Sequence, residues 1–329
     1  MNINHSPNDY KEIKLNDLIP NQILDFDIYI LLPNNKKFIK YITRLNSLDD
    51  EQLLRLKCKN IVQLFIHKDE IEIYNKFISA TIKENISKNN LNESQKIELI
   101  KSSARNIIEN INSVTGDESA VAWTNNCINL VKMVVTELTD TKIASSYDKL
   151  NGLLSTQPTL INHSLSVSSL GVVFGMALGI HDSKSISELA LGGLLHDVGF
   201  ANTPIEVVDK YMKSEQITEE ERSLLTLHPS AGYQIVSKIF KSTKLSDNII
   251  KIILEHHENA AGTGYPIGKS LPSLSYLCKI AAIGDKISRE ILKLKNVDLT
   301  YSLVKLLKAQ EECREYDKYI LSQLLNVIK

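Results

Sequence analysis

The fold is decided by the run LALGGLLHDVG, residues 189–199. Its apolar first part, of the kind that packs inside a protein, leads directly into His196 and Asp197. A carboxylate that follows so apolar a segment is costly to bury unless a partner compensates its charge, and a metal ion is the simplest partner. Histidines recur along the segments that follow, and the facing helices of a bundle project metal ligands into a shared interior. The run therefore indicates a helical bundle with a metal site in its core.

The C-terminal half, beyond about residue 148, has helix signals and no convincing strand. Ser185 with Glu188, and Thr218 with Glu221, have the Ser/Thr-x-x-Glu spacing in which two side chains cap each other's backbone amides at a helix start. The helices predicted from these signals and from apolar periodicity are 158–178, 185–198, 218–228, 231–240, 246–258, 275–292 and a terminal group after residue 298.

The N-terminal part predicts a small mixed α/β domain. Apolar runs at 26–32 and 38–43 flank the turn-forming residues 33–35 and predict a hairpin. Helical spacing at 48–57 is followed by a β-branched run at 61–66, which suits a buried strand.

Helical spacing begins again at Lys68, a polar surface connection is expected over 85–92, and helices at 94–113 and 119–138 join the two halves. We expect a mainly α chain made of a small mixed α/β domain at 1–88, connecting helices at 89–148, and an all-helical domain at 149–329.

The composition argues against several classes of protein. Lys and Arg number 38 against 39 Asp and Glu, so the net charge of −1 argues against a binder of long nucleic acid. The 43% hydrophobic content suits a large core. The N-terminus has no apolar signal core, no apolar run approaches the ~20 residues of a membrane span, and four isolated cysteines suit a reducing compartment. We expect a cytoplasmic protein with no membrane partner.

Other side chains suited to metal binding follow His196 and Asp197. His228 precedes Pro229, and Asp285 lies in the apolar run 280–287, where an uncompensated carboxylate is costly. His256 and His257 are adjacent, so on a helix their side chains diverge by roughly 100° and could serve two metals, or one metal and a substrate.

Two histidines of this half, His163 and His228, also have an ordinary interpretation. His163 in isolation suits a hydrogen-bonded core histidine, and His228 suits the C-cap of a helix. His181 and Asp182 repeat the His-Asp dipeptide, but they lie between Gly179 and polar residues. We expect this second dipeptide to lie in a solvated connection with no role in metal binding.

Four motifs follow one another in the C-terminal half: Leu195-His196-Asp197-Val198-Gly199, Leu227-His228-Pro229, His256-His257-Glu258 and Gly264-Tyr265-Pro266. Together they resemble the HD-GYP family of cyclic di-GMP phosphodiesterases, over residues 149–329. The resemblance implies an all-helical HD fold with a dinuclear centre, often of iron or manganese. The metal ligands that it implies are His163, His196, Asp197, His228, His256, His257 and Asp285, with Asp197 as the bridging carboxylate.

Two divalent ions at such a centre lower the pKa of a bridging water and clamp phosphoryl oxygens for in-line attack. The resemblance implies that cyclic di-GMP is opened to linear pGpG and cleaved further to GMP, with Asp197 and Tyr265 in catalytic roles. Gly262, Gly264, Tyr265 and Arg289 are the expected substrate-binding residues. The two glycines allow close backbone approach, although a plain turn with a packed tyrosine is the ordinary reading of this loop.

The sequence departs from the family at positions near the expected substrate. The family usually has lysine where this chain has Phe200, and aspartate where it has Ala261. The loss of a cation near the phosphate would leave transition-state charge less stabilised. Thr159 stands where some trinuclear members carry a carboxylate, so two metals are expected and not three.

A further departure follows Asp285, where the family typically has a second aspartate and then an Arg-Pro-Tyr-Arg/Lys stretch. Arg289, Lys293 or Lys295 could supply the missing cation, or these charges could belong to a solvated helix face.

Three functions therefore remain open. The first is a cyclic dinucleotide phosphodiesterase with reduced activity. The second is a cyclic dinucleotide receptor or protein-interaction module that keeps its metals, and the third is a nucleotide phosphohydrolase of the wider HD superfamily, which does not predict the Gly-Tyr-Pro loop. For the N-terminal domain and the helices over 94–144, we expect regulation, contact within a homodimer, or contact with a signalling protein.

Overall fold

The structure is a computed structural model that describes residues 9–328 except 16–17, 19, 33–36, 62, 89–91, 140–142, 242–244, 295–298 and 314. The chain forms two compact units, Met1–Asn106 and Ile107–Lys329. It is mainly α with one small sheet in the first unit, which confirms the predicted fold class. The predicted division into 1–88, 89–148 and 149–329 stays a prediction.

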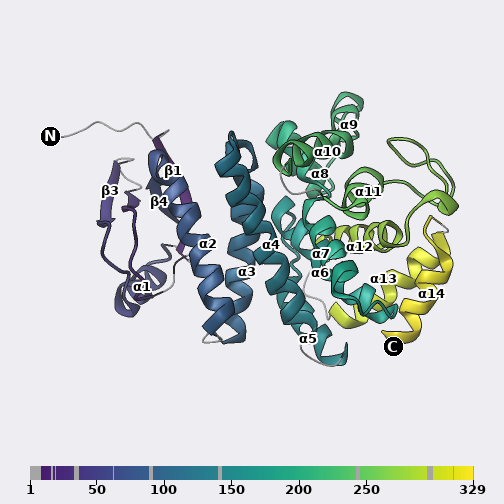
Figure 1. The fold of residues 1–329 in the computed structure, drawn as a ribbon, viewed down its shortest axis with the longest axis horizontal. Helices are drawn as coiled ribbons and strands as arrows, with labels where there is room; N and C mark the ends of the chain where they lie inside the picture. The colour runs from purple at the N-terminus through teal and green to yellow at the C-terminus, as the bar shows by residue number, and fades with distance from the viewer. Residues whose placement is uncertain are drawn as a thin grey trace. The chain divides into compact units, whose positions relative to one another are not determined.

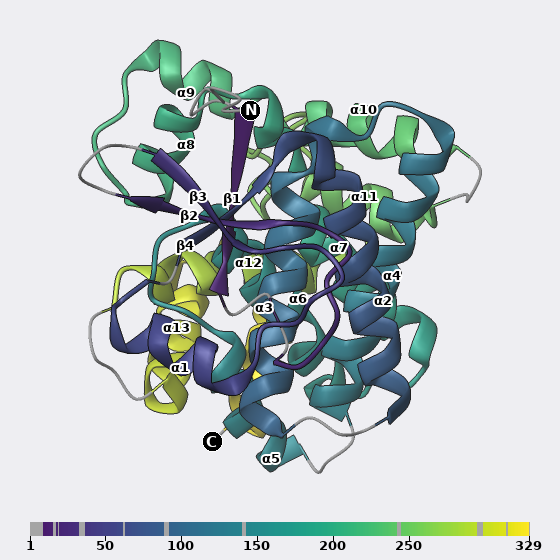
Figure 2. The ribbon, with the colours of Figure 1, turned by 90° about the vertical axis from the view of Figure 1, so that its left-hand side faces the viewer.

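The first unit contains a four-stranded sheet of order β1-β4-β2-β3 (Figure 2). Its strands are β1 (Tyr10–Lys14), β2 (Ile28–Leu32), β3 (Lys37–Ile42) and β4 (Gln63–His67). β2 pairs with β3 antiparallel, which confirms the hairpin, while its predicted turn lies outside the described residues. Strand β1 was not predicted, because only Tyr10 and Ile13 are buried in a segment that is otherwise charged.

The helices of the first unit are α1 (Asp50–Cys58), α2 (Ile71–Lys88) and most of α3 (Glu93–Glu109), and a short 3-10 turn, η3 (Lys68–Glu70), leads into α2. Phe26 makes edge-to-face ring contacts with Tyr74 and Phe77 of α2, and all three rings are buried. The predicted surface connection over 85–92 is wrong at its start, because α2 continues to Lys88.

The second unit is a bundle of helices (Figure 1). In chain order these are the 3-10 turn η4 (Ile111–Ser113), α4 (Asp117–Thr139), α5 (Ile143–Leu153), α6 (Leu160–Ala177), α7 (Ser183–Leu195), the 3-10 turn η5 (Val198–Asn202), α8 (Ile205–Met212), α9 (Glu219–Leu225), α10 (His228–Ile239), α11 (Asp247–Glu255), the 3-10 turn η6 (Leu271–Ser273), α12 (Tyr276–Leu292), α13 (Leu299–Cys313) and α14 (Lys318–Val327).

Helix α6 is the central helix of this bundle and packs against both α7 and α12. By length and composition alone it could cross a membrane, but 72% of that span is buried inside the structure, as expected for a core helix. Helix α7 in turn packs against α11. These contacts bring the ends of several helices to one region of the interior.

The start of α7 differs from the prediction. Its N-cap is Asp182, whose carboxylate accepts a hydrogen bond from the Ser185 amide at 2.8 Å, so the predicted Ser185–Glu188 capping pair is wrong. Aspartate caps a helix as well as serine does, and Glu188 instead turns inward to accept a hydrogen bond from the Asn248 side chain. The second predicted pair, Thr218 with Glu221, forms the expected capping box of α9.

Candidate metal centre

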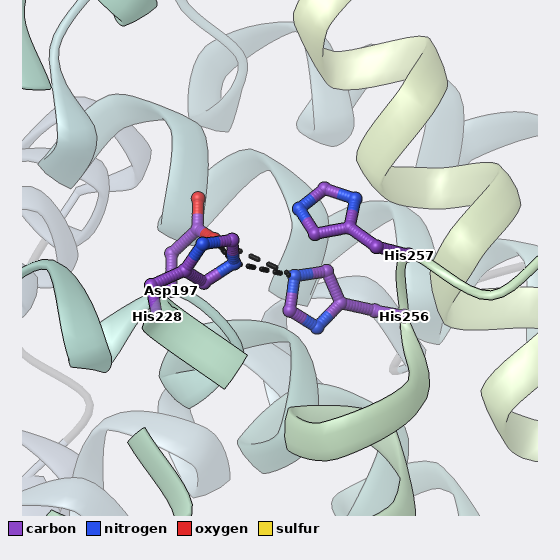
Figure 3. A group of neighbouring side chains, drawn as sticks. All are labelled: Asp197, His228, His256 and His257. Atoms are coloured by element: carbon purple, nitrogen blue, oxygen red, sulfur yellow. Dashed lines mark hydrogen bonds and ion pairs between the residues drawn. The ribbon is translucent and has the colours of Figure 1, made fainter. Parts of the chain in front are cut away.

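All seven side chains that the sequence proposes as metal ligands meet in the interior of the second unit. They form one group of four, Asp197, His228, His256 and His257, and one group of three, His163, His196 and Asp285. The ligand atoms of each group lie within 4.8 Å of one another. Figure 3 shows the group of four, with its imidazoles and carboxylate turned toward a common point.

Five helices supply these residues. His163 lies in the first turn of α6, His196 and Asp197 follow the last residue of α7, and Asp285 lies within α12. His228 is the first residue of α10, and its Nδ1 also lies 2.6 Å from the carbonyl of Leu225, the last residue of α9.

His256 and His257 follow the last residue of α11. They were expected to diverge along a helix, but their ring centroids lie 4.1 Å apart and both belong to the group of four. Both residues lie beyond Glu255, the last residue of α11, so they are not two successive positions within a regular helix.

Gly199 lets the turn after Asp197 lie directly on the start of α10. A methyl group at this position would overlap the carbonyl of His228 and would lie 2.6 Å from the amide nitrogen of Gly232. Because Asp197 and His228 both serve the group of four, this close approach helps to set the distance between them.

Backbone carbonyls fix the tautomers of three histidines. His196 Nδ1 lies 2.8 Å from the Gly193 carbonyl, His228 Nδ1 lies 2.6 Å from the Leu225 carbonyl, and His256 Nδ1 lies 3.1 Å from the Ile252 and Ile253 carbonyls. A carbonyl only accepts hydrogen bonds, so each Nδ1 must carry the proton. In the neutral ring, each Nε2 then offers a lone pair to the centre, as in metal-binding histidines generally.

These lone pairs face each other. The Nε2 atoms of His228 and His256 lie 3.1 Å apart. Two lone pairs at such a distance repel each other unless a cation lies between them. His196 Nε2 lies 3.2 Å from His163 Nε2, but no carbonyl fixes the His163 tautomer, because its Nδ1 faces the Ser288 hydroxyl, which can donate or accept. Among the described residues, none hydrogen-bonds Asp197 Oδ1 or His257 Nε2, although both atoms are buried. The donor set, imidazole nitrogens and carboxylate oxygens, therefore fits divalent metal ions.

Asp197 directs one oxygen to each group. Its Oδ1 lies 3.0 Å from His228 Nε2, and its Oδ2 lies 3.3 Å from His196 Nε2 and 3.4 Å from His163 Nε2. The carboxylate is fully buried. This placement suits a carboxylate that bridges two ions.

The ionisation of the centre suits metal binding. Burial would raise the pKa of Asp197, but the surrounding imidazoles outweigh burial and hold that pKa well below its ordinary value. The pKa of Asp285 is likewise held low, against burial, by Arg289 and His163. Burial lowers the pKa of His228, His256 and His257, which favours their neutral forms, whereas the pKa of His163 is raised, against burial, by its contacts with Asp197 and Asp285. Anionic carboxylates and neutral imidazoles are the ligand forms of a divalent ion.

Arg289 was predicted to bind substrate, and the structure places its guanidinium at the group of three. Its Nε donates to Asp285 Oδ1 at 2.9 Å and its Nη2 donates to Asp197 Oδ2 at 3.3 Å. The guanidinium carbon lies 4.4 Å from the ring centroid of Tyr211, a cation–π contact. The sequence offered no motif that identified Tyr211, because the helix that carries it, α8, was not predicted.

The predicted Tyr265 also reaches the centre. Its ring lies against His257, with centroids 4.5 Å apart. Burial raises the pKa of the Tyr265 hydroxyl well above its ordinary value, so this residue is a neutral hydrogen-bond donor. Gly264 lies against the backbone of His257 and Glu258, whereas Gly262 lies at the base of the loop beside Gly268.

Glu258 holds this loop in place, a role that sequence reasoning missed. Its carboxylate accepts hydrogen bonds from the backbone amides of Ile267, Gly268 and Lys269, at 2.7, 3.1 and 2.7 Å. The adjacent Glu255 accepts from the Lys269 ammonium at 2.6 Å. The loop that carries Tyr265 is therefore tied to the end of α11, next to His256 and His257.

The other singled-out residues lie as follows. His181 is exposed ahead of α7, as expected for a dipeptide without a metal role. Thr159 is the N-cap of α6. Phe200 is 2% exposed, and its ring lies 4.1 Å from the ring of His228, in a cluster of apolar side chains from η5, α8 and α9. Ala261 forms a backbone bridge with Ser270 at the base of the loop.

Known proteins resemble this chain in sequence. A cyclic di-GMP phosphodiesterase (PdeB) of Borreliella burgdorferi is 31% identical over 171 residues, which are 51% of this chain and 42% of that protein. A cyclic di-GMP phosphodiesterase of Pseudomonas aeruginosa is 31% identical over 123 residues, 37% of this chain and 28% of that protein. The matches thus span less than half the length of either relative.

A solved structure and a family profile also match this chain. A structure titled as an HDG"Y"P protein from Bdellovibrio bacteriovorus has a TM-score of 0.66 at 23% identity, over 97% of this chain and 99% of that one. Residues 149–316 match the profile described as HD domain. The chain therefore belongs to the HD domain family.

Proposed function

We propose that this chain is a phosphodiesterase that depends on two divalent metal ions and opens cyclic di-GMP to linear pGpG, and further to GMP, with reduced activity. The observation that carries the proposal is the pair of ligand groups that meet at Asp197. The names of the sequence relatives support the choice of substrate.

The ligands are His163, His196, Asp197, His228, His256, His257 and Asp285, and the ions are iron or manganese, which suit nitrogen and oxygen donors. Two ions held there would act as Lewis acids on the phosphodiester and on the water that attacks it. The protein's own part is to hold the ligands in the ionised or neutral forms described above, inside a buried site.

The residues around the ligands would orient the substrate. Asp197 and Tyr265 have the catalytic roles, with Tyr265 as a neutral donor toward a phosphate or guanine oxygen. The Arg289 guanidinium faces the same centre and would pair with a phosphate oxygen. Gly262 and Gly264 allow the loop backbone to approach the substrate.

The partner is a cyclic dinucleotide in the cytoplasm, and not a long nucleic acid or a membrane. A small anion needs only the local charge of the metals and Arg289, so the net charge of −1 is no obstacle. A homodimer or a signalling protein would make contact through the N-terminal half.

The test is metal analysis of anaerobically purified protein, followed by a product assay with cyclic di-GMP. We expect bound iron or manganese and formation of pGpG, which Asp197→Ala abolishes. His181→Ala is the matched control, since it alters the exposed His-Asp dipeptide and should leave turnover unchanged. Metal-loaded protein that turns over no cyclic dinucleotide would contradict the proposal.

A second function, a cyclic dinucleotide receptor that keeps its metals, is favoured by the position of Phe200. Its buried ring covers one side of His228 and brings no cation to the centre. This alternative predicts that the metal-loaded protein binds cyclic di-GMP tightly without forming product. Product formation that depends on Asp197 would exclude it.

A further inference from the structure

We infer that the two metal positions are unequal, and that the group of His163, His196 and Asp285 binds a divalent cation more weakly because the Arg289 guanidinium occupies its carboxylate oxygens. The inference rests on the proposed dinuclear centre and adds an order of metal uptake to it. The group of Asp197, His228, His256 and His257 fills first.

The two oxygens that Arg289 contacts both face the group of three, although one of them belongs to Asp197 of the group of four. Arg289 donates to Asp285 Oδ1 and to Asp197 Oδ2. These same oxygens lie 3.0 and 3.4 Å from His163 Nε2, so they are the ones that an ion in the group of three would use. The oxygen that faces the group of four, Asp197 Oδ1, accepts no hydrogen bond from any described residue.

The charge of Arg289 opposes a second cation. An ion entering the group of three must displace or share two charge-assisted hydrogen bonds, and it must approach a guanidinium in a site of low dielectric constant. The group of four offers three neutral imidazoles and the Asp197 Oδ1 oxygen, so an ion there displaces no hydrogen bond of Arg289.

The surroundings hold Arg289 in this position. It follows Asp285 by four residues on α12, so the two side chains share one face of the helix. Its side chain is only 16% exposed, and the Tyr211 ring covers the guanidinium. An arginine packed in this way is not a mobile surface charge.

The test is a calorimetric titration of the full-length chain, stripped of metal with a chelator, with Mn²⁺. We expect two binding steps, the second weaker by roughly 10-fold or more, and an Arg289→Gln variant in which the second step strengthens by roughly 10- to 100-fold while the first is unchanged. Lys293→Gln is the matched control on the same helix, since that ammonium is half-exposed and pairs with Glu290 outside the centre. It should change neither step.

Ligand variants assign the steps. His257→Gln should remove the tight step, and His163→Gln the weak one. Arg289→Lys keeps the charge but loses the planar guanidinium, so the Mn²⁺ affinity of its second step should lie between those of the wild type and Arg289→Gln. If the glutamine variant does not unfold cooperatively, the lysine variant serves as the test in its place.

Two equal steps in the wild type, or a second step that is unchanged or weaker in both Arg289 variants, would overturn the inference. Either result would leave the dinuclear centre intact. A wild-type chain that binds no Mn²⁺ at all would instead contradict the proposed function.

Discussion

At the level of single residues, Gly199 shows how closely the centre depends on backbone packing. A side chain there would push η5 away from α10 and separate Asp197 from His228. We expect Gly199→Ala to lower the free energy of unfolding by about 1–3 kcal/mol, as overpacking does, and to weaken metal binding at the group of four. Urea unfolding and Mn²⁺ titration measure the two effects.

The control for this change is Gly116→Ala, because a methyl group at Gly116 meets nothing within 4 Å. It should alter stability by no more than about 0.5 kcal/mol, the range of ordinary surface changes. Equal effects of the two substitutions would show that the η5–α10 approach does not matter.

Phe200 is the residue where the family's lysine cannot simply be restored. The ring is buried beside Val207, Val208, Met212 and Leu225. We expect Phe200→Lys to destabilise the chain by about 3–5 kcal/mol, because it leaves a charge unpaired in an apolar cluster, and not to raise activity. Phe200→Leu should lose only about 1 kcal/mol. Urea unfolding compares the two variants, and a stable, more active lysine variant would refute this reading.

At the level of elements, the loop over 261–270 depends on one carboxylate. Glu258→Gln replaces an acceptor with an amide donor, so at least one of the three loop amides loses its partner. We expect a loss of about 1–3 kcal/mol, typical of hydrogen bonds to a charged group, and faster hydrogen exchange at residues 267–269.

Glu290→Gln serves as the control for Glu258, because Glu290 pairs with lysines on α12 away from the loop. It should leave exchange in the loop unchanged. Unaltered exchange in the Glu258 variant would mean that the loop is held by its own turns, such as those of Asn259.

At the level of the whole molecule, metal binding should stabilise the second unit. The ligands come from five helices, α6, α7, α10, α11 and α12, and the site does not exist in the unfolded chain. At about 100 times its dissociation constant, Mn²⁺ should add ~2.7 kcal/mol for each occupied position. For a unit of this size that corresponds to a rise in Tm of roughly 5–10 °C per position.

Calorimetry with Mn²⁺, and again after a chelator, checks this expectation. The combined variant His163→Gln and His257→Gln should lose most of the rise. A Tm that is indifferent to metal in the wild type would argue against the centre.

Local patterns were enough to predict much of this protein. Apolar periodicity predicted α4, α6 and α12 to within a few residues, because long helices with a buried face leave a strong signal. The ordered motifs contain five of the seven side chains that meet in the interior, and the family resemblance implied the other two, His163 and Asp285. Short elements with weak patterns, β1 and α8, were missed.

Residue types and spacing in the sequence thus predict the helical bundle, and the order of the motifs gives the family resemblance, which in turn implies the ligand set. Three-dimensional packing decided the remaining contacts. It placed the Arg289 guanidinium on two ligand carboxylates, with the Tyr211 ring over it. It also placed the Phe200 ring on His228 and brought the rings of His256 and His257 together. Each depends on where a helix ends or on which residues from distant segments meet. No spacing within one segment encodes such contacts.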